Sequence, residues 1–263
     1  MRFDVVTILP PMLEAVSRHG VSGRAHERGA WSLHAWNPRD HAAGAYRSID
    51  DRPFGGGPGM VMLAEPLART LDAIARAQRE AVGEPAPVVY LSPQGRPVGH
   101  EDVARWVRLP ALTLLCGRYE GIDQRLLDAR VDDEVAVGDI VVSGGELPAM
   151  MLIDAVVRWL PGVLNDAASA PQDSFAEGLL DCPHYTRPEV LDGRPVPAVL
   201  LSGHHANIDR WRREQALAAT TRRRPDLLAR ARATGRLSRA DEAFLRQADE
   251  VAAPDGGQPD ERK

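Results

Sequence analysis

The chain of 263 residues carries a formal net charge of −5, and hydrophobic residues make up 44% of it. This length allows one large or two modest domains, and the apolar content can fill a real core. Cys116 and Cys182 are the only cysteines and belong to no CxxC or Cys/His cluster, which argues against a disulfide framework or a structural zinc site. Asp4 and two prolines interrupt the apolar N-terminus, and no 18-residue apolar stretch follows, so we expect a cytoplasmic protein without a membrane segment.

Charge is distributed unevenly along the chain. Residues 204–246 contain eleven arginines against five acidic residues, whereas 247–263 contain five acidic residues and two basic ones. Lys263 is the only lysine, a bias that genomic base composition alone could produce. Because phosphate binding depends on local charge, the basic segment remains compatible with nucleic-acid binding despite the acidic average.

The first 160 residues alternate between short apolar runs and helical spacing. Strands are predicted at 2–9, 31–36, 88–91, 112–116 and 131–142, and helices at 64–80, 100–107, 122–129 and 146–160, with two more before 31. Such alternation is typical of an α/β fold with a mostly parallel sheet. Pro148 falls in the first turn of the 146–160 helix, where its missing N–H does no harm.

The composition changes after residue 160. Pro, Ala, Asp and Asn dominate 161–174, as in a linker, and from 203 onward the sequence predicts helices with exposed arginines. We therefore predict an α/β domain at 1–160, a linker at 161–176 and a smaller α-helical domain at 177–248. Residues 249–263 are expected to be disordered.

Three predicted strands end in turns of small residues: YLSPQGRP (90–97), CGRYEGID (116–123) and VVSGGELP (141–148). Each alone could be an ordinary tight turn, but ligands in parallel sheets bind beyond the carboxyl ends of the strands. Together the turns predict one pocket lined by backbone groups. None contains a Walker A lysine or a full dinucleotide fingerprint, which disfavours a phosphate-bearing cofactor. A neutral or cationic ligand between apolar walls such as Leu91, Ile140 and Val142 fits better.

Other residues permit two interpretations each. Glycine-rich residues 55–59 could form a flexible surface loop or allow a large ligand to approach closely. Asp173 could cap a short helix, and Arg158 could snorkel or form an ion pair, instead of taking part in chemistry. The Ser202-Gly203 pair predicts a helix start, and the arginines at 222–224 could be a solvated helix end or a phosphate contact. The neighbouring His204 and His205 do not suggest a metal site, since adjacent residues on a helix point apart.

Long blocks of the sequence resemble the bacterial tRNA (guanine-N1)-methyltransferases, a family of the SPOUT methyltransferase superfamily. In chain order, between about residues 2 and 228, these blocks are DDRPFGGGPGM, YLSPQG, LLCGRYEGID, VGDIVVSGGELPAMMLIDAVVRWLPGVL, DSF, GLLDCPHYTRPEVLDG and VPAVLLSGHHANIDRWRR. The resemblance implies a mostly parallel sheet with a deep trefoil knot and an α-helical C-terminal domain. It also implies a homodimer whose active site lies at the subunit interface.

The same resemblance implies S-adenosyl-L-methionine as cofactor and tRNA as substrate, methylated at N1 of the guanosine 3′ to the anticodon (position 37). Asp173 would be the general base, reaching the cofactor bound mainly by the other subunit, and Arg158 would stabilise the charge on O6. The implied cofactor-binding residues are Tyr90, Leu91, Ser92, Pro93, Gly117, Tyr119, Glu120, Val137, Gly138, Asp139, Ile140, Val141, Val142, Gly144, Gly145 and Pro148. The implied tRNA-binding residues are Gly55, Gly56, Gly57, Gly59, His184, Arg187, Ser202, His204, Arg212 and Arg213. The family suggests a Mg²⁺ requirement, but no cluster of residues has ligand spacing, so no metal site is predicted.

The sequence departs from the family pattern at Leu9, Phe54 and Ile140, where the family usually has Phe, Tyr and Tyr. One alternative function is a SPOUT enzyme of another specificity, such as a ribose 2′-O-methyltransferase, but it would leave Asp173 without a role. Another is a non-catalytic RNA-binding protein, against which the presence of Asp173 and Arg158 argues. A dinucleotide-dependent oxidoreductase is disfavoured by the missing fingerprint.

Overall fold

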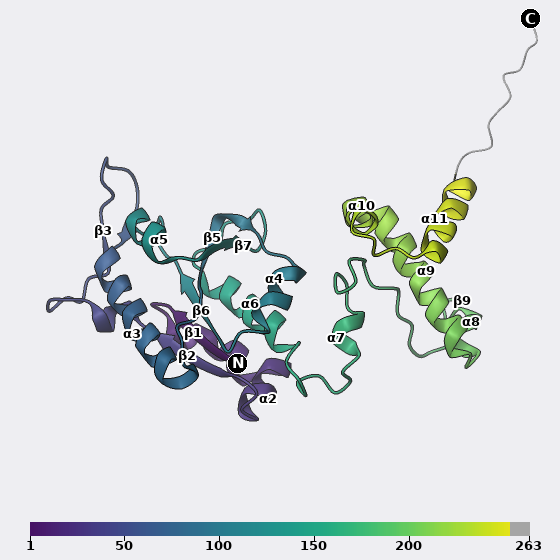
Figure 1. The fold of residues 1–263 in the computed structure, drawn as a ribbon, viewed down its shortest axis with the longest axis horizontal. Helices are drawn as coiled ribbons and strands as arrows, with labels where there is room; N and C mark the ends of the chain where they lie inside the picture. Colours follow the sequence, from purple (N-terminus) through teal and green to yellow (C-terminus); the bar gives the residue numbers. More distant parts are fainter. Residues whose placement is uncertain (253–263) are drawn as a thin grey trace, which may run out of the picture. The chain divides into compact units, whose positions relative to one another are not determined.

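The computed structural model describes residues 1–252, and the chain divides into two compact units, one spanning Met1–Ala167 and one starting at Ala168 (Figure 1). The boundary falls within the segment predicted as a linker. The elements of the first unit are β1 (Arg2–Val6), η1 (Pro10–Leu13), α1 (Glu14–Arg18), α2 (Gly20–Glu27), β2 (Ser32–Trp36), η2 (Pro38–His41), β3 (Asp50–Asp51), β4 (Val61–Met62), α3 (Ala64–Val82), β5 (Val88–Pro97), α4 (His100–Trp106), β6 (Ala111–Cys116), α5 (Gln124–Arg130), β7 (Asp133–Ala136) and α6 (Glu146–Val157).

A five-stranded sheet with the order β2-β1-β6-β5-β7 forms the centre of the first unit, and every pairing in it is parallel. The fold class predicted from the alternating pattern is thus confirmed as far as an α/β unit with a parallel sheet. Because both faces of the sheet are covered, its central strands are mostly apolar, although Asp4 of β1 and Thr113 of β6 are buried polar residues. All six residues of β6 are buried.

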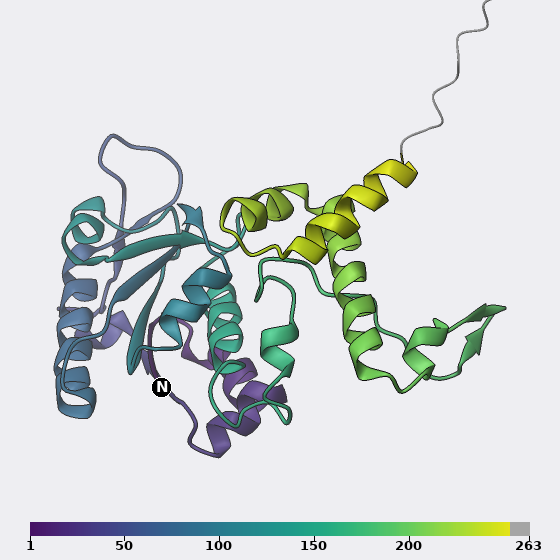
Figure 2. The same ribbon diagram turned by 45° about the vertical axis from the view of Figure 1, so that its right-hand side comes forward.

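Alternate side chains of the strands enter two separate apolar cores. Phe3, Val5 and Leu114 face one core, to which α1, α2, α4 and α6 contribute. Val6 and Leu115 face the other, which α3 and α5 cover. Helices therefore pack on both faces of the sheet, as Figures 1 and 2 show. The carboxyl ends of β5, β6 and β7 then meet at one edge of the unit.

The last predicted strand of this unit is wrong over two thirds of its length, since four of its twelve residues form a strand. The sequence predicts a strand over 131–142, but β7 ends at Ala136 and the chain then forms a loop up to α6. Gly138 has a φ of +154°, and Ile140 and Val141 are exposed. The apolar residues after β7 thus belong to a loop, whose side chains line a pocket instead of a core.

The second unit is mainly helical. Its elements are α7 (Ser169–Gln172), β8 (Val190–Leu191), β9 (Arg194–Pro195), α8 (Ala198–Leu201), α9 (His205–Arg223), α10 (Pro225–Ala233) and α11 (Arg239–Ala252). The helices α8, α10 and α11 pack against α9 (Figures 1 and 2). Its apolar core consists of Leu179, Leu217, Leu228, Ala231 and Leu245.

Two boundaries in the second unit differ from prediction. The N-cap of α9 is His204, not Ser202, whose hydroxyl instead accepts a hydrogen bond from the His204 N–H at 3.2 Å. Helix α11 extends to Ala252, so the first four residues of the segment predicted as disordered, 249–252, are helical. The rest of that segment lies outside the described residues. Across residues 1–252, none of the helices combines the length and the apolar character needed to cross a membrane.

Candidate functional site

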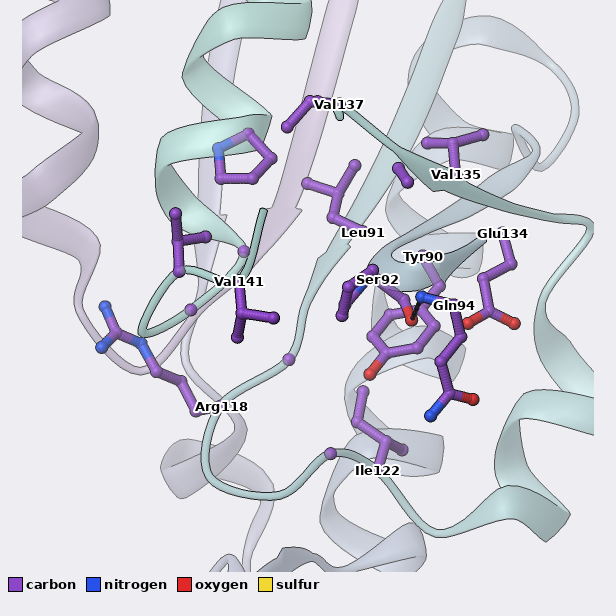
Figure 3. Close-up of a pocket in the computed structure, with 18 of the residues that line it drawn as sticks. Tyr90, Leu91, Ser92, Gln94, Arg118, Ile122, Glu134, Val135, Val137 and Val141 are labelled. Carbon is purple, nitrogen blue, oxygen red and sulfur yellow. Dashed lines mark hydrogen bonds between the residues drawn. The ribbon is translucent and has the colours of Figure 1, made fainter. Parts of the chain in front are cut away.

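A pocket with a cavity volume of about 360 Å³ lies at the carboxyl ends of β5, β6 and β7 (Figure 3). All three turns that the sequence predicts to share a ligand line it, together with the loop after β7. Of the predicted cofactor-binding residues, Asp139 alone is absent from the lining. The lining residues that the sequence did not single out are Gln94, Arg118, Gly121, Ile122, Gln124, Leu127, Glu134, Val135, Ala136 and Ser143.

One wall of the pocket is an irregularity in β5. The pairing of β5 with β7 shifts register between Leu91 and Arg96, so the residues between them bulge out of the ladder. The Gln94 N–H donates to the Ser92 hydroxyl at 3.1 Å, which closes the bulge (Figure 3). A Cβ on Gly95 would collide with the backbone of Val135, and this close approach requires glycine.

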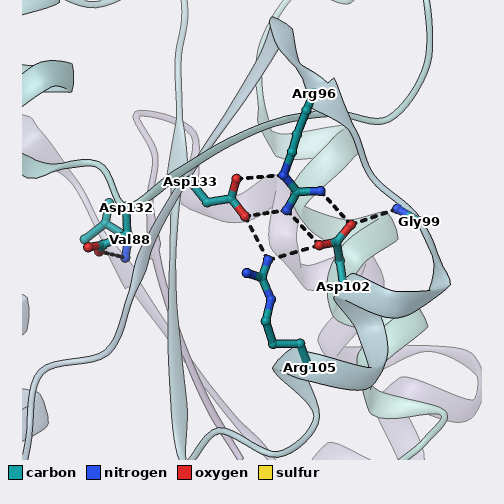
Figure 4. A network of polar contacts seen from close by, with 7 residues as sticks. All are labelled: Val88, Arg96, Gly99, Asp102, Arg105, Asp132 and Asp133. Carbon is teal, nitrogen blue, oxygen red and sulfur yellow. Dashed lines mark hydrogen bonds and ion pairs between the residues drawn. The ribbon is translucent and has the colours of Figure 1, made fainter.

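An ion-pair network fixes the end of this bulge (Figure 4). Arg96 donates to both oxygens of Asp102, at 2.7 and 2.9 Å, and to both oxygens of Asp133, at 2.5 and 3.1 Å. Arg105 donates to the same two carboxylates at 3.0 and 2.8 Å. Burial opposes the charge on Asp102, yet the hydrogen bonds from Arg96 and from the Gly99 N–H lower its pKa overall. The network thus joins β5, β7 and α4.

The glycines of the other two turns allow the chain segments to approach each other. The Gly145 N–H donates to the carbonyl of Gly117 at 3.0 Å, and a Cβ on Gly145 would lie 2.7 Å from the Cα atom of Cys116. A Cβ on Gly117 would lie 2.8 Å from the hydroxyl of Tyr90. Burial, with a smaller contribution from the nearby Glu134, raises the pKa of Tyr90 to about 12, so its hydroxyl stays protonated at neutral pH.

A buried carboxylate connects the pocket loops. Glu146, the first residue of α6, is completely buried and accepts a hydrogen bond from the Thr7 hydroxyl at 2.7 Å. Arg118 donates to it through Nε at 3.0 Å and forms an ion pair with it, with Nη2 2.9 Å from the carboxylate; Nη1 also donates to the carbonyl of Ser143 at 3.1 Å. A Cβ on Gly144 would collide with the Arg118 guanidinium. The pair thus holds the turn after β6 against the loop before α6.

The loop after β7 leaves apolar side chains at the surface beside the pocket. Ile140 is 64% exposed and Val141 is 84% exposed, and on the adjoining helix α6 Leu147 and Met151 are about half-exposed. Apolar side chains grouped in this way indicate a surface that a ligand or another protein chain covers.

The two residues predicted to carry the chemistry lie in different units. Arg158 directly follows α6 in the first unit, and its N–H donates to the Asp154 carbonyl at 3.1 Å. Asp173 is an exposed residue of the second unit and follows α7. Asp173 is the C-cap of the short helix α7, and its N–H donates to the Ala170 carbonyl at 3.3 Å; it starts no helix, because residues 174–177 form a turn, which the Ala176 N–H closes onto the Asp173 carbonyl at 3.2 Å. Their roles as base and charge stabiliser stay predictions.

Four of the predicted tRNA-binding residues are the glycines of the loop at 55–59. All four have a positive φ, between 75° and 125°. A Cβ on Gly59 would collide with the side chain of Glu120, a lining residue of the pocket, and the Glu120 N–H donates to the carbonyl of Met60 at 2.9 Å. The loop is therefore anchored at the pocket, while Phe54 at its start is fully exposed.

The remaining predicted tRNA-binding residues belong to the second unit. His184, Arg187 and Arg212 line a separate cavity there, whereas Ser202 and His204 form the turn before α9. Arg213 donates to Asp241 and to Glu177, so its guanidinium is already held by two carboxylates. Contacts of all these residues with tRNA stay predictions.

The segment 181–184 also contains three potential metal ligands that the sequence analysis did not group. Ligand atoms of Asp181, Cys182 and His184 lie within 4.8 Å of one another. However, they are already partners of one another: Asp181 accepts from the Cys182 N–H at 2.7 Å and pairs with His184 Nε2 at 2.8 Å. These contacts account for the cluster without an ion.

Comparison with known proteins agrees with this geometry. The family model described as tRNA (Guanine-1)-methyltransferase TrmD matches residues 1–230. Proteins named tRNA (guanine-N(1)-)-methyltransferase from Ralstonia nicotianae and Cupriavidus metallidurans are 59% and 60% identical over 256 and 257 residues, covering 97% of both chains in each case. The protein of that name from Burkholderia mallei (strain SAVP1) is 60% identical over 245 residues, 93% of each chain. The chain therefore belongs to the tRNA (guanine-1)-methyltransferase family.

Proposed function

We propose that this protein transfers a methyl group from S-adenosylmethionine to N1 of the guanosine that follows the anticodon of tRNA. The observation that carries the proposal is the pocket of three small-residue turns at the carboxyl ends of β5, β6 and β7 in a chain of this family. The names of relatives at about 60% identity support the choice of tRNA guanine as the methyl acceptor.

The lining of the pocket fits S-adenosylmethionine. Gly117, Gly144 and Gly145 bring the backbone close to the cavity, and an added Cβ at any of them would meet neighbouring atoms. Leu91 and Pro148 add apolar surface, and the described lining residues include no lysine, which suits a cationic ligand without phosphates. When bound, S-adenosylmethionine supplies an electrophilic methyl group on its sulfonium.

The acceptor atom requires help from the protein, because N1 of guanine carries a proton and is a poor nucleophile until that proton leaves. Asp173 removes it as general base. As the proton leaves, negative charge develops on O6, and the guanidinium of Arg158 stabilises it. The target guanosine must also leave its stack to reach the pocket, as in other base-modifying enzymes. The glycine loop at 55–59 approaches it through backbone atoms.

We further infer a homodimer in which Asp173 of one subunit serves the cofactor of the other, and a trefoil knot formed where the loop after β7 returns to the turn after β6. The exposed Ile140 and Val141, beside the pocket, support the dimer because a partner chain would cover them. The hydrogen bond between Gly145 and Gly117 supports the knot, since it joins the end of the loop after β7 to the turn after β6.

The test uses purified protein, labelled S-adenosylmethionine and tRNA carrying guanosine or adenosine at the target position, followed by nucleoside analysis. We expect N1-methylguanosine from the guanosine substrate only, and a loss of at least about 100-fold in rate for Asp173→Ala, as for a missing general base. Binding of S-adenosylmethionine to this variant should be unchanged. Asp166→Ala, which removes the other carboxylate of segment 161–176, is the matched control. Equal losses in both variants would contradict the assignment of the base to Asp173.

A further inference from the structure

The second unit contains a cavity of about 420 Å³ between residues 183–189 and the start of α9. This volume is within the range of small-molecule sites. Leu200 and Ile208 contribute apolar surface to it. Two aromatic rings also line it: the centroids of Tyr185 and Trp211 lie 6.1 Å apart, with 56° between the ring planes.

These rings are not explained by the core of the second unit. That core is aliphatic apart from the partly buried Phe244 packed against it, and it contains neither Tyr185 nor Trp211. Tyr185 is 49% exposed, and its hydroxyl has no hydrogen-bond partner among the described residues. The fold thus keeps a large, half-exposed aromatic face at the mouth of a cavity, where it can stack on a flat ligand.

Positive charge surrounds the rings. Arg187 forms no ion pair or hydrogen bond with the described residues, and the carboxylate nearest to Arg212 is that of Asp209, at 3.9 Å. Among the residues that line the cavity, the two guanidinium groups face one carboxylate, that of Glu189, while Asp209 lies outside the lining. His184 is held by Asp181 at 2.8 Å. The cavity therefore combines stacking surface with cations that are available for a phosphate.

We propose that this cavity binds one unpaired nucleobase of the tRNA, other than the base that is methylated, with the adjoining phosphate at Arg187 and Arg212. The inference rests on the proposed function, which makes the substrate a tRNA whose target lies in a single-stranded loop. Proteins read such loops by stacking splayed bases on aromatic side chains, with arginine at the backbone. Stacking at Tyr185 would fix the loop in register while the neighbouring target guanosine enters the methylation site.

The experiment compares Tyr185→Ala with Tyr185→Phe in the full chain. Stacking on an aromatic side chain strengthens binding by roughly 5- to 150-fold per base, so we expect Tyr185→Ala to weaken tRNA binding by that factor. Tyr185→Phe retains the ring and should bind tRNA as wild type does. Both variants should bind S-adenosylmethionine normally, which controls for folding because that pocket belongs to the first unit.

A second step identifies the stacked base. Each nucleotide of the anticodon loop is replaced in turn by an abasic one, and binding is measured with wild type and Tyr185→Ala. At one position other than the target, we expect the abasic loss and the Tyr185→Ala loss not to add, since both remove the same contact. Additive losses at every position, or unchanged tRNA binding by Tyr185→Ala, would overturn the proposal. Failure of wild type to form N1-methylguanosine would instead strike the proposed function, because the binding cycle does not depend on methyl transfer.

Discussion

Replacing Arg118 by methionine tests whether the buried Glu146 carboxylate depends on its ion pair. The carboxylate is fully buried, and its two hydrogen bonds come from Arg118 Nε and the Thr7 hydroxyl, with Arg118 Nη2 also within ion-pair distance at 2.9 Å. Arg118→Met leaves a buried charge with one neutral donor, a change that destabilises proteins by about 3–5 kcal/mol. Glu146→Gln removes the charge but can still accept from Thr7, so we expect a smaller loss of about 1.5–3 kcal/mol.

The double variant Arg118→Met/Glu146→Gln distinguishes a charge effect from lost packing. It contains no unpaired buried charge, so its loss should be smaller than the sum of the two single losses by about 1 kcal/mol or more. The free energy of unfolding would be measured by urea titration at one fixed protein concentration, because the stability of the proposed dimer would depend on concentration. Tryptophan fluorescence is a suitable signal because four of the five tryptophans, all except Trp211, lie in the first unit.

Arg118→Met and the double variant should also lose affinity for S-adenosylmethionine, because Arg118 holds the carbonyl of Ser143 at the pocket. Isothermal titration would measure this. Surface substitutions ordinarily change the free energy of unfolding by no more than about 0.5 kcal/mol. If Arg118→Met changes it by no more than this, the dependence of Glu146 on Arg118 is refuted.

Three further predictions concern the two units separately. Gly145→Ala would place a Cβ 2.7 Å from the Cα atom of Cys116, so we expect this variant to lose S-adenosylmethionine binding, as measured by calorimetry. The control is Gly83→Ala, at the C-terminal end of α3 and outside the pocket lining, which should retain binding despite lower stability. Burial raises but hydrogen bonds from Arg213 and Ser238 lower the pKa of Asp241, and the net shift is downward. Its contribution to stability is therefore present above the ordinary aspartate pKa of about 3.9 and lost as pH falls through the lower folded value. Below about pH 4, the urea midpoint of wild type should thus fall more steeply with decreasing pH than the midpoint of Asp241→Asn. At neutral pH, the substitution should lower the free energy of unfolding by about 2 kcal/mol. Parallel plots of midpoint against pH for the two proteins would contradict this prediction. Finally, if arginines of the protein contact three tRNA phosphates, raising the salt concentration from about 50 to about 200 mM should weaken tRNA binding by about 40-fold. An affinity that does not change with salt would exclude arginine–phosphate contacts.

The sequence by itself determined the features that depend on neighbouring residues. The alternation of apolar runs and helical spacing predicted the parallel sheet and α3, and Pro148 marked the first turn of α6. Glycine placement predicted the turns that line the pocket, since only glycine tolerates such close backbone approach. The resemblance of long motifs was confirmed by the family match.

Tertiary structure decided what depends on distant parts of the chain. Glu146 meets Thr7, 139 residues earlier, and Arg118, 28 residues earlier, and no local pattern encodes such pairs. The run after β7 has the apolar composition of a strand, but it forms a loop that lines a pocket. Apolar composition alone does not predict whether a side chain packs in a core or lines a pocket. Likewise, Tyr185 lies beside Trp211, and Arg213 pairs with Asp241, only in the folded second unit. These contacts form when α9 packs against segments far from it in sequence.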